Sequence, residues 1–208
     1  NFAINRYQLN VAAETGGLVI GSGIFVHGTR ATIAAAPQTG YEFARWNGDD
    51  VANANAFVTT VDMTQDHNIS ANFTPSQLVL AISTSTGGNT TGSGTYDYNS
   101  HVPITAIPDT GYDFAGWTGA GVSVPDSANS TVSLPQDRNI TANFVAKPYV
   151  LTVNAGAGGS ATGSGTFPYR TDVNVIATPA TGYDFAGWTG EGVADASSAD
   201  TTVSMTQD

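Results

Sequence analysis

The chain has 208 residues, and its 17 acidic against six basic residues give a formal net charge of −11. An acidic chain whose few basic residues are scattered repels phosphate groups, so we expect neither nucleic-acid binding nor attachment to anionic membranes. Cysteine is absent, which excludes disulfides, thiol catalysis and zinc–thiolate sites. No apolar run reaches the length of a membrane-spanning helix, so membrane insertion is not expected either.

The sequence repeats itself at a fixed period. The three tryptophans of the chain are evenly spaced, because the interval from Trp46 to Trp117 equals that from Trp117 to Trp188. A fixed period of this length indicates tandem copies of one structural unit. The copies, predicted as three small domains, are residues 6–76, 77–147 and 148–208.

Both ends of the sequence fall inside this period. Residues 1–5 begin with Asn1-Phe2, which matches Asn72-Phe73, and are interpreted as the end of a preceding repeat. Repeat 3 reaches Asp208, the counterpart of Asp66, and lacks the final strand that follows in repeat 1. Two explanations stay open: the sequence is part of a longer array, or a neighbouring molecule supplies the strand.

In chain order, each repeat begins with alternating apolar residues, as at Tyr7, Leu9 and Val11, which predict a strand with one buried face. The glycine pair Gly16-Gly17 and its counterparts predict a hairpin turn or a bulge. Gly-Ser-Gly follows and predicts a strand bend, because a phosphate loop would need a lysine and a helix. The next strand ends at a proline, and Pro103 inside it predicts an edge position in repeat 2.

The most distinctive element is Gly-Tyr-x-Phe-Ala-x-Trp-x-Gly, which begins at Gly40, Gly111 and Gly182. A loop of variable sequence and two further strands complete the repeat. No long window has the apolar period of a helix. We therefore predict an all-β chain with about six short strands per repeat and little or no helix.

The aromatic residues of this element have two interpretations. Exposed rings would form a platform for stacking sugars, whereas a unit of this size needs large buried side chains to fold. Tyr41 and Phe43 are two residues apart and share one face of a strand, which favours the core. The residues predicted to form the structural core are Tyr41, Phe43, Trp46, Met63, Phe73, Tyr112, Phe114, Trp117, Leu134, Phe144, Tyr183, Phe185, Trp188 and Met205.

Residues that could carry chemistry do not recur together. His27, His67 and His101 occupy three different positions of the repeat, and no serine or carboxylate recurs beside them. Asn47-Gly48-Asp49-Asp50 comes closest to a calcium loop but has no counterpart in the other repeats. Asp66 and its counterparts are expected to cap a turn. We therefore predict no catalytic, cofactor-binding or metal-binding residues and a non-enzymatic function.

Three motifs together resemble a known family. They are Gly-Tyr-x-Phe-x-x-Trp-x-Gly from Gly182 to Gly190, Thr-Val-x-Met ending at Met205, and Asn-Ile-Thr-Ala-Asn-Phe ending at Phe144. The combination is similar to the divergent internalin-type B repeat, also described as the Listeria–Bacteroides repeat of bacterial surface proteins. The resemblance covers all three repeats. It implies small β-grasp-like modules in tandem, an extracellular or cell-surface location, and no catalytic residues.

These observations favour a stalk or spacer segment of an extracellular bacterial protein, with adhesion as a secondary role. Its partners would be the neighbouring repeats of the same chain and, for adhesion, a glycan or a host or matrix protein. The variable loops at 49–57, 120–130 and 191–200 would carry any specificity.

Two alternative functions remain open. The first is a self-assembling fibre or matrix subunit, in which self-association through an open sheet edge completes the fold by strand exchange. The second is a carbohydrate-binding module that uses the exposed aromatic residues Tyr96, Tyr98 and Tyr169.

Overall fold

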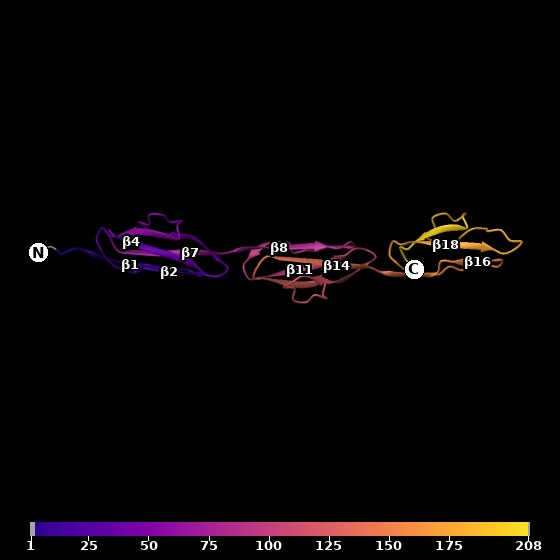
Figure 1. Cartoon of the computed structure of the whole chain (residues 1–208), viewed down its shortest axis with the longest axis horizontal. Coiled ribbons are helices and arrows are strands. Elements are labelled where there is room, and N and C mark those ends of the chain that lie inside the picture. Colours follow the sequence, from indigo (N-terminus) through magenta and orange to yellow (C-terminus); the bar gives the residue numbers. More distant parts are fainter. Residues whose placement is uncertain (1–2, 208) are drawn as a thin grey trace. The chain divides into compact units, whose positions relative to one another are not determined.

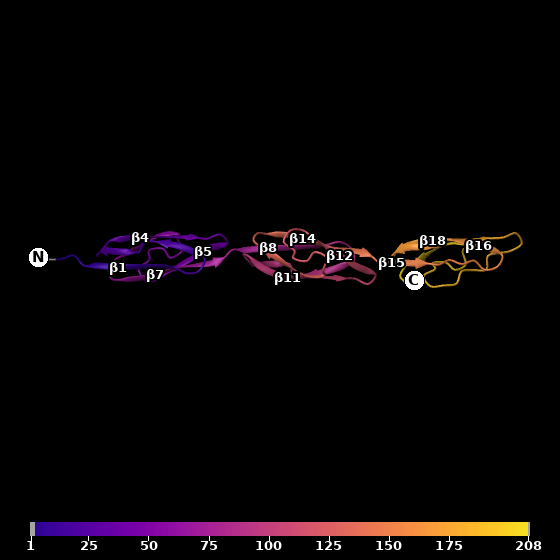
Figure 2. The same ribbon diagram turned by 90° about the horizontal axis from the view of Figure 1, so that it is seen from below.

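The structure is a computed structural model that describes residues 3–207 (Figure 1, Figure 2). Every regular element in this range is a β-strand, which confirms the all-β fold class. No helix among these residues is long and apolar enough to cross a membrane. The interpretation of Asn1-Phe2 as the end of a preceding repeat lies outside the described residues, and so does Asp208.

The chain divides into two compact units, and their border runs through repeat 2. The first unit holds the chain up to Ala81 together with Ser93–Val102 and Thr131–Arg138. The second unit holds Ile82–Gly92, Pro103–Ser130 and the chain from Asn139 onward. Repeat 1 therefore lies wholly in the first unit and repeat 3 wholly in the second.

Repeat 1 has seven strands in the part of the chain that the structure describes, one more than the sequence predicts. They are β1 (Arg6–Ala13), β2 (Gly17–Ile20), β3 (Gly23–Val26), β4 (Arg30–Pro37), β5 (Tyr41–Asn47), β6 (Val58–Asp62) and β7 (His67–Pro75). The additional strand arises because the Gly-Ser-Gly element separates β2 from β3. The Ser22 hydroxyl accepts a hydrogen bond from the N–H of Val11 at 2.9 Å and donates to its carbonyl oxygen at 3.3 Å. This element thus ends one strand and fastens the next to β1.

The strands of repeat 1 form two sheets. A mixed four-stranded sheet has the order β3-β1-β7-β5, in which β1 and β7 are parallel neighbours. An antiparallel three-stranded sheet has the order β2-β4-β6. Buried residues alternate along β4 and β7, as period-two strands with one inner face require. Leu9, Ile33 and Ile69 from the two sheets belong to a single core cluster.

Repeat 2 follows the same plan. Its strands are β8 (Gln77–Thr84), β9 (Gly88–Thr91), β10 (Gly94–Asp97), β11 (Ser100–Pro108), β12 (Tyr112–Thr118), β13 (Asn129–Leu134) and β14 (Arg138–Ala146). The sheet orders are β10-β8-β14-β12 and β13-β11-β9, which correspond strand by strand to those of repeat 1.

The predicted edge position of Pro103 is wrong, because β11 is the middle strand of its sheet. The N–H of Ala106 donates to the carbonyl oxygen of Ala128 at 2.8 Å, on the β13 side of the strand. Main-chain nitrogens point to opposite sides at successive residues of a strand, so the nitrogen of Pro103, three residues earlier, points toward β9. Pairing between β9 and β11 extends only from Thr105 to Pro108. Pro103 therefore lies beyond the end of β9, where its missing N–H removes no ladder hydrogen bond.

Repeat 3 has fewer strands among the described residues. They are β15 (Pro148–Leu151), β16 (Gly159–Thr162), β17 (Gly165–Pro168), β18 (Asp172–Pro179) and β19 (Asp200–Ser204), in the sheets β15-β17 and β16-β18-β19. Residues 183–189 form no strand, although their sequence matches β5 and β12. Strands β5 and β12 pair with β7 and β14, and the described part of repeat 3 contains no counterpart of that partner.

Large apolar side chains fill the core of repeat 1. Trp46 is 1% exposed and lies in one cluster with Met63 and Phe73. Tyr41 and Phe43 are half-buried and pack against this cluster. In the other repeats the buried members of the predicted core are Trp117, Leu134 and Met205, and the half-buried ones are Tyr112, Phe114, Phe144, Phe185 and Trp188.

Tyr183 departs from the predicted core, because its side chain is 58% exposed. It belongs to the segment 183–189, which forms no strand. The ring still lies against Gly158, but no paired strand holds this segment over the core. The prediction fails here because it assumed the strand pairing that repeats 1 and 2 have.

Glycine backbone supports two aromatic rings where β2 begins. A Cβ atom on Gly16 would lie 2.2 Å from Cδ1 of Tyr41, and one on Gly17 would lie 2.1 Å from Cζ of Phe73. The next nearest atoms are neighbouring ring carbons at similar distances, so the face of each ring covers the glycine. Only a residue without a side chain allows this approach, which gives the glycine pair a role beyond a turn. The corresponding pairs elsewhere are Gly87 with Tyr112, Gly88 with Phe144 and Gly158 with Tyr183.

A methyl group at Gly88 should therefore destabilise repeat 2. The Gly88→Ala substitution would place Cβ 2.4 Å from the ring of Phe144. Overpacking of this kind lowers the free energy of unfolding by about 1–3 kcal/mol, which thermal unfolding followed by circular dichroism detects as a lower Tm. Gly156→Ala is the control, because nothing lies within 4 Å of its Cβ position. An equal Tm for the two variants would contradict the expectation.

Candidate functional site

The loop after each Trp-x-Gly sequence is the segment in which the repeats differ most. In repeat 1 it connects β5 to β6, and Trp46 holds it at two points. The main-chain N–H of Trp46 donates to the carbonyl oxygen of Ala54 at 2.7 Å, and its indole Nε1 donates to that of Ala56 at 2.9 Å. The buried ring thus fixes the path of the loop through main-chain oxygens, which any loop sequence supplies.

The other two repeats hold their loops with the same pair of hydrogen bonds. The main-chain N–H and the indole Nε1 of Trp117 donate to the carbonyl oxygens of Pro125 at 2.8 Å and Ser127 at 2.9 Å. Those of Trp188 donate to the carbonyl oxygens of Ala196 at 2.8 Å and Ser198 at 2.9 Å. The rings of Trp46 and Trp117 are buried, so neither presents a face on which a sugar could stack. The variable loops are therefore the exposed part of this site, and the tryptophans are their anchors.

Inside the loop of repeat 3, the side chain of Asp195 organises a tight turn. Its Oδ1 accepts hydrogen bonds from the N–H of Ser197 at 2.9 Å and from the hydroxyl of Ser197 at 2.6 Å. The N–H of Asp195 donates to Oγ1 of Thr201 at 3.0 Å. Repeat 1 has two of these bonds at the equivalent positions. The N–H of Asn53 donates to Oγ1 of Thr59, and the N–H of Asn55 donates to Oδ1 of Asn53. Different loop sequences thus share one hydrogen-bonded frame.

The two hydrogen bonds from Ser197, the hydroxyl first, hold the pKa of the exposed Asp195 carboxyl below its ordinary value of 3.8. A lowered folded-state pKa means that the ionised group stabilises the loop above the ordinary value. This contribution is lost as the pH falls through the folded-state pKa.

Titration of the Asp195 carboxyl carbon by NMR should give a midpoint below 3.8, and Ser197→Ala should raise that midpoint toward 3.8. The reason is that Ser197→Ala removes the hydroxyl that stabilises the carboxylate. Ser160→Ala, which removes another exposed serine hydroxyl from repeat 3, should leave the midpoint unchanged. The same midpoint in the parent chain and in Ser197→Ala would show that the Ser197 hydroxyl does not stabilise the Asp195 carboxylate.

The histidines lie apart from one another. His27 and His101 are exposed, whereas His67 is 3% exposed in β7, with its Nε2 3.6 Å from Oδ2 of Asp50. That nitrogen has no hydrogen-bond partner in the described part of the chain. Among residues 3–207, no three histidine or acidic side chains converge as a metal ion would require.

Asp66 has a different role from the predicted turn cap. Its Oδ1 accepts a hydrogen bond from the N–H of Gln8 at 2.7 Å, and Oδ1 of Asp137 accepts one from the N–H of Val79 at 2.8 Å. Each carboxylate therefore fastens the first strand of its repeat to the turn before the last strand. The third counterpart, Asp208, lies outside the described residues.

Repeat 1 exposes apolar side chains on the outer face of its three-stranded sheet, a feature that the sequence analysis missed. Leu18 and Ile20 on β2 and Val58 on β6 are exposed, and Ala34 on β4 lies between Ile20 and Val58. The positions that correspond to Leu18, Ile20 and Val58 are Asn89, Thr91 and Asn129 in repeat 2, and Ser160, Thr162 and Asp200 in repeat 3. Alignment of the three repeats would have revealed this face, because only repeat 1 is apolar at all three positions.

The tyrosines considered for sugar binding, Tyr96, Tyr98 and Tyr169, are half-buried. The rings of Tyr98 and Tyr169 lie over Gly40 and Gly111, so one face of each ring is covered by protein. The structure thus brings these tyrosines against glycine backbone rather than together on one open surface.

One protein family matches nearly the whole chain. The family model described as the divergent InlB B-repeat domain matches residues 7–77, 78–148 and 149–208. No curated protein matches the chain. The three matched segments follow one another without a gap, as the even spacing of the tryptophans requires.

Proposed function

The chain belongs to the divergent InlB B-repeat family, and on this premise we propose that it is a non-enzymatic spacer segment of a bacterial surface protein, with adhesion as a secondary role. The observation that carries the proposal is the repetition of one small two-sheet unit at a fixed period. In repeat proteins each unit contacts mainly its sequence neighbours, so added units extend the array. The family is one of surface-protein repeats, which supports an extracellular or cell-surface location.

The β-grasp-like description belongs to the same proposal. The mixed sheet β3-β1-β7-β5 supports it, because its two central strands are the first and the last of the repeat and run parallel. The covering layer in repeat 1 is the antiparallel sheet β2-β4-β6, which contributes Ile33 and Val61 to the shared core.

The non-enzymatic part of the proposal is based on the distribution of reactive side chains. His27, His67 and His101 lie at three different positions of the repeat, so no histidine belongs to the common fold. General acid–base chemistry needs such groups within hydrogen-bond reach of one substrate. The exposed apolar face of repeat 1 supports the secondary adhesive role, because exposed patches of this kind mark contact sites.

Scattering in solution tests the spacer role. A variant with one additional copy of residues 77–147 inserted after Lys147 should remain a monomer by light scattering. Its maximum dimension in small-angle X-ray scattering should increase by the step that each existing repeat contributes, because the new unit contacts only its neighbours. A radius of gyration that increases only as for a compact globule would argue against a spacer.

A self-assembling fibre or matrix subunit is the second candidate, and a groove in repeat 3 is the place where it would bind a donated strand. The groove has a volume of about 610 Å³, and its lining includes Leu151, Val153 and Met205. The residues at the corresponding positions of repeat 1 pack in the cluster that contains Ile69 and Ala71 of β7. A strand of the β7 type therefore suits the groove, whether it comes from a second molecule or from the same one.

A synthetic peptide with the sequence of residues 138–146 separates these two sources. If copies of the chain donate strands to one another, light scattering should detect association of the chain, and the peptide should abolish it by filling the groove. Peptide binding to a chain that stays monomeric at high concentration would assign the groove to a strand of the same molecule and remove this candidate.

A further inference from the structure

Main-chain hydrogen bonds connect repeat 1 to the turn that follows β10 of repeat 2, within the first unit. Thr74-Pro75-Ser76 links the two repeats. The N–H of Ser76 donates to the carbonyl oxygen of Gly40 at 2.8 Å, and the N–H of Tyr98 donates to that of Ser76 at 2.8 Å. The linker residue is thus held between the preceding repeat and the following one.

The next joint, within the second unit, has the same connections at the equivalent positions. The N–H of Lys147 donates to Gly111 at 2.8 Å, and the N–H of Tyr169 donates to Lys147 at 2.9 Å. Lys147 Nζ also lies 3.4 Å from Oδ1 of Asp113, but the two side chains are 45% and 60% exposed, so this ion pair contributes little. The first joint has Ser76 in place of the lysine, so the main-chain bonds are the feature that both joints share.

An aromatic ring covers the glycine at each joint. A Cβ atom on Gly40 would lie 2.0 Å from Cδ1 of Tyr98, and one on Gly111 would lie 2.3 Å from Cδ1 of Tyr169. The neighbouring ring carbons are at similar distances, so the ring face lies on the glycine. Each glycine has φ near +80°, a conformation that already favours glycine, and the ring adds a second reason. Tyr169 also meets Tyr112 edge to face, with centroids 5.8 Å apart.

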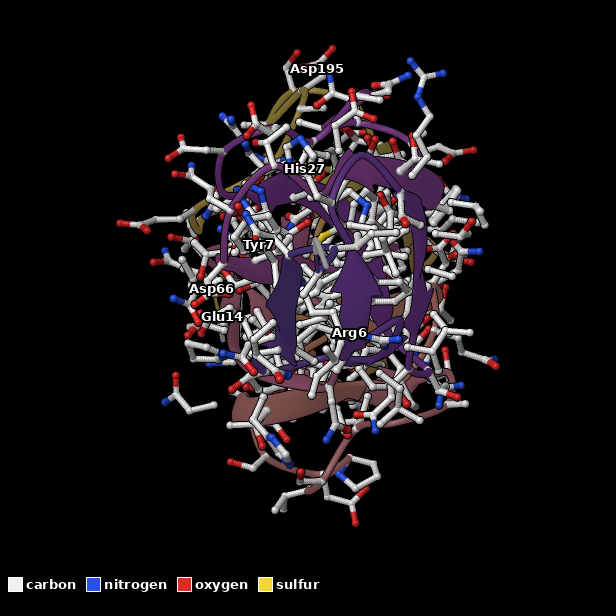
Figure 3. The ribbon with its side chains drawn as sticks, turned by 90° about the vertical axis from the view of Figure 1, so that its left-hand side faces the viewer. Arg6, Tyr7, Glu14, His27, Asp66 and Asp195 are labelled. Atoms are coloured by element: carbon white, nitrogen blue, oxygen red, sulfur yellow. The ribbon has the colours of Figure 1, made fainter. Side chains whose placement is uncertain are left out.

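The repeats also contain one glycine at this position without a ring against it, and one ring at the equivalent position without a glycine beneath it. Gly182 corresponds to Gly40 and has φ of +84°, yet nothing lies within 4 Å of its Cβ position and it is exposed. His27 corresponds to Tyr98 and is exposed, with its ring 5.8 Å from that of Tyr7 (Figure 3). The ring and the glycine are thus in contact at the two joints where both belong to adjoining repeats, 1 with 2 and 2 with 3.

We propose that this tyrosine–glycine contact couples each repeat to the next and holds the joint in one orientation. The surface at Gly40 is then an interaction surface, and the partner that it fits is a following repeat with a ring at the position of Tyr98. Two main-chain hydrogen bonds alone would leave rotation about the linker. A ring seated face-on against a glycine removes that freedom, because any tilt brings ring carbons into contact with the backbone. The coupling concerns the joint alone and goes beyond the spacer function.

A distance measurement across the first joint tests the proposal. The chain has no cysteine, so Gln65→Cys and Gln136→Cys, at equivalent exposed positions of repeats 1 and 2, can be spin-labelled specifically. Double electron–electron resonance should give one narrow distance peak for the parent chain. Tyr98→Ala and Gly40→Ala should each cause loss of the narrow peak, because the first removes the ring and the second displaces it. Tryptophan fluorescence checks that both repeats remain folded.

Two control variants change the equivalent positions where the contact is absent. Gly182→Ala places the same methyl group at nearly the same φ but meets no ring, and His27→Ala removes the equivalent ring where no glycine lies beneath it. Both should keep the narrow peak between positions 65 and 136. The proposal is overturned if the parent chain gives a broad distribution, if Tyr98→Ala and Gly40→Ala keep the narrow peak, or if His27→Ala broadens it as much as Tyr98→Ala does.

Discussion

Aromatic rings that lie on glycine backbone are the interaction on which each repeat depends. A repeat of this small size, in a chain without cysteine, has no disulfide to hold it, so its stability comes from a few large side chains. In repeat 1 the rings of Tyr41 and Phe73 come from two strands of the mixed sheet and rest on Gly16-Gly17, where the other sheet begins. The contact therefore joins the two sheets and fixes where β2 starts. A side chain at either glycine would push the sheets apart.

The frame and the loops of the repeat are held by different chemistry, and this difference explains their different variability. Glycines and rings keep their positions in successive repeats, because no other residue leaves room for a ring on the backbone. The loops are held by Trp46, Trp117 and Trp188 through main-chain carbonyl oxygens, which every residue type offers. Loop sequences can therefore diverge while the fold that carries them stays the same. Any specificity of an adhesive kind has its natural place in these loops.

Spacing in the sequence is enough to predict the tandem arrangement, the all-β class and the variable loops, because each depends on local periodicity. The role of Gly16-Gly17 was out of reach, because its partners Tyr41 and Phe73 lie far along the sequence and only the tertiary fold brings them there. The exposure of Tyr183 was equally hidden, since it follows from strand pairing and not from the residue itself. The loop anchors were missed for a third reason: the acceptors of the Trp46 hydrogen bonds are main-chain oxygens, which leave no mark in a sequence.

An NMR measurement shows directly whether glycine backbone supports the aromatic rings. One of the two Hα atoms of Gly17 takes the place that Cβ has in other residues, and it lies over the face of the Phe73 ring. The ring current should therefore shift the resonance of this Hα atom upfield. Gly28 in the same repeat is the reference, because nothing lies within 4 Å of its Cβ position. If the rings lie on the glycines, the Hα resonances of Gly17 and Gly88 are shifted upfield and that of Gly28 is ordinary. Ordinary resonances at all three glycines would contradict this contact.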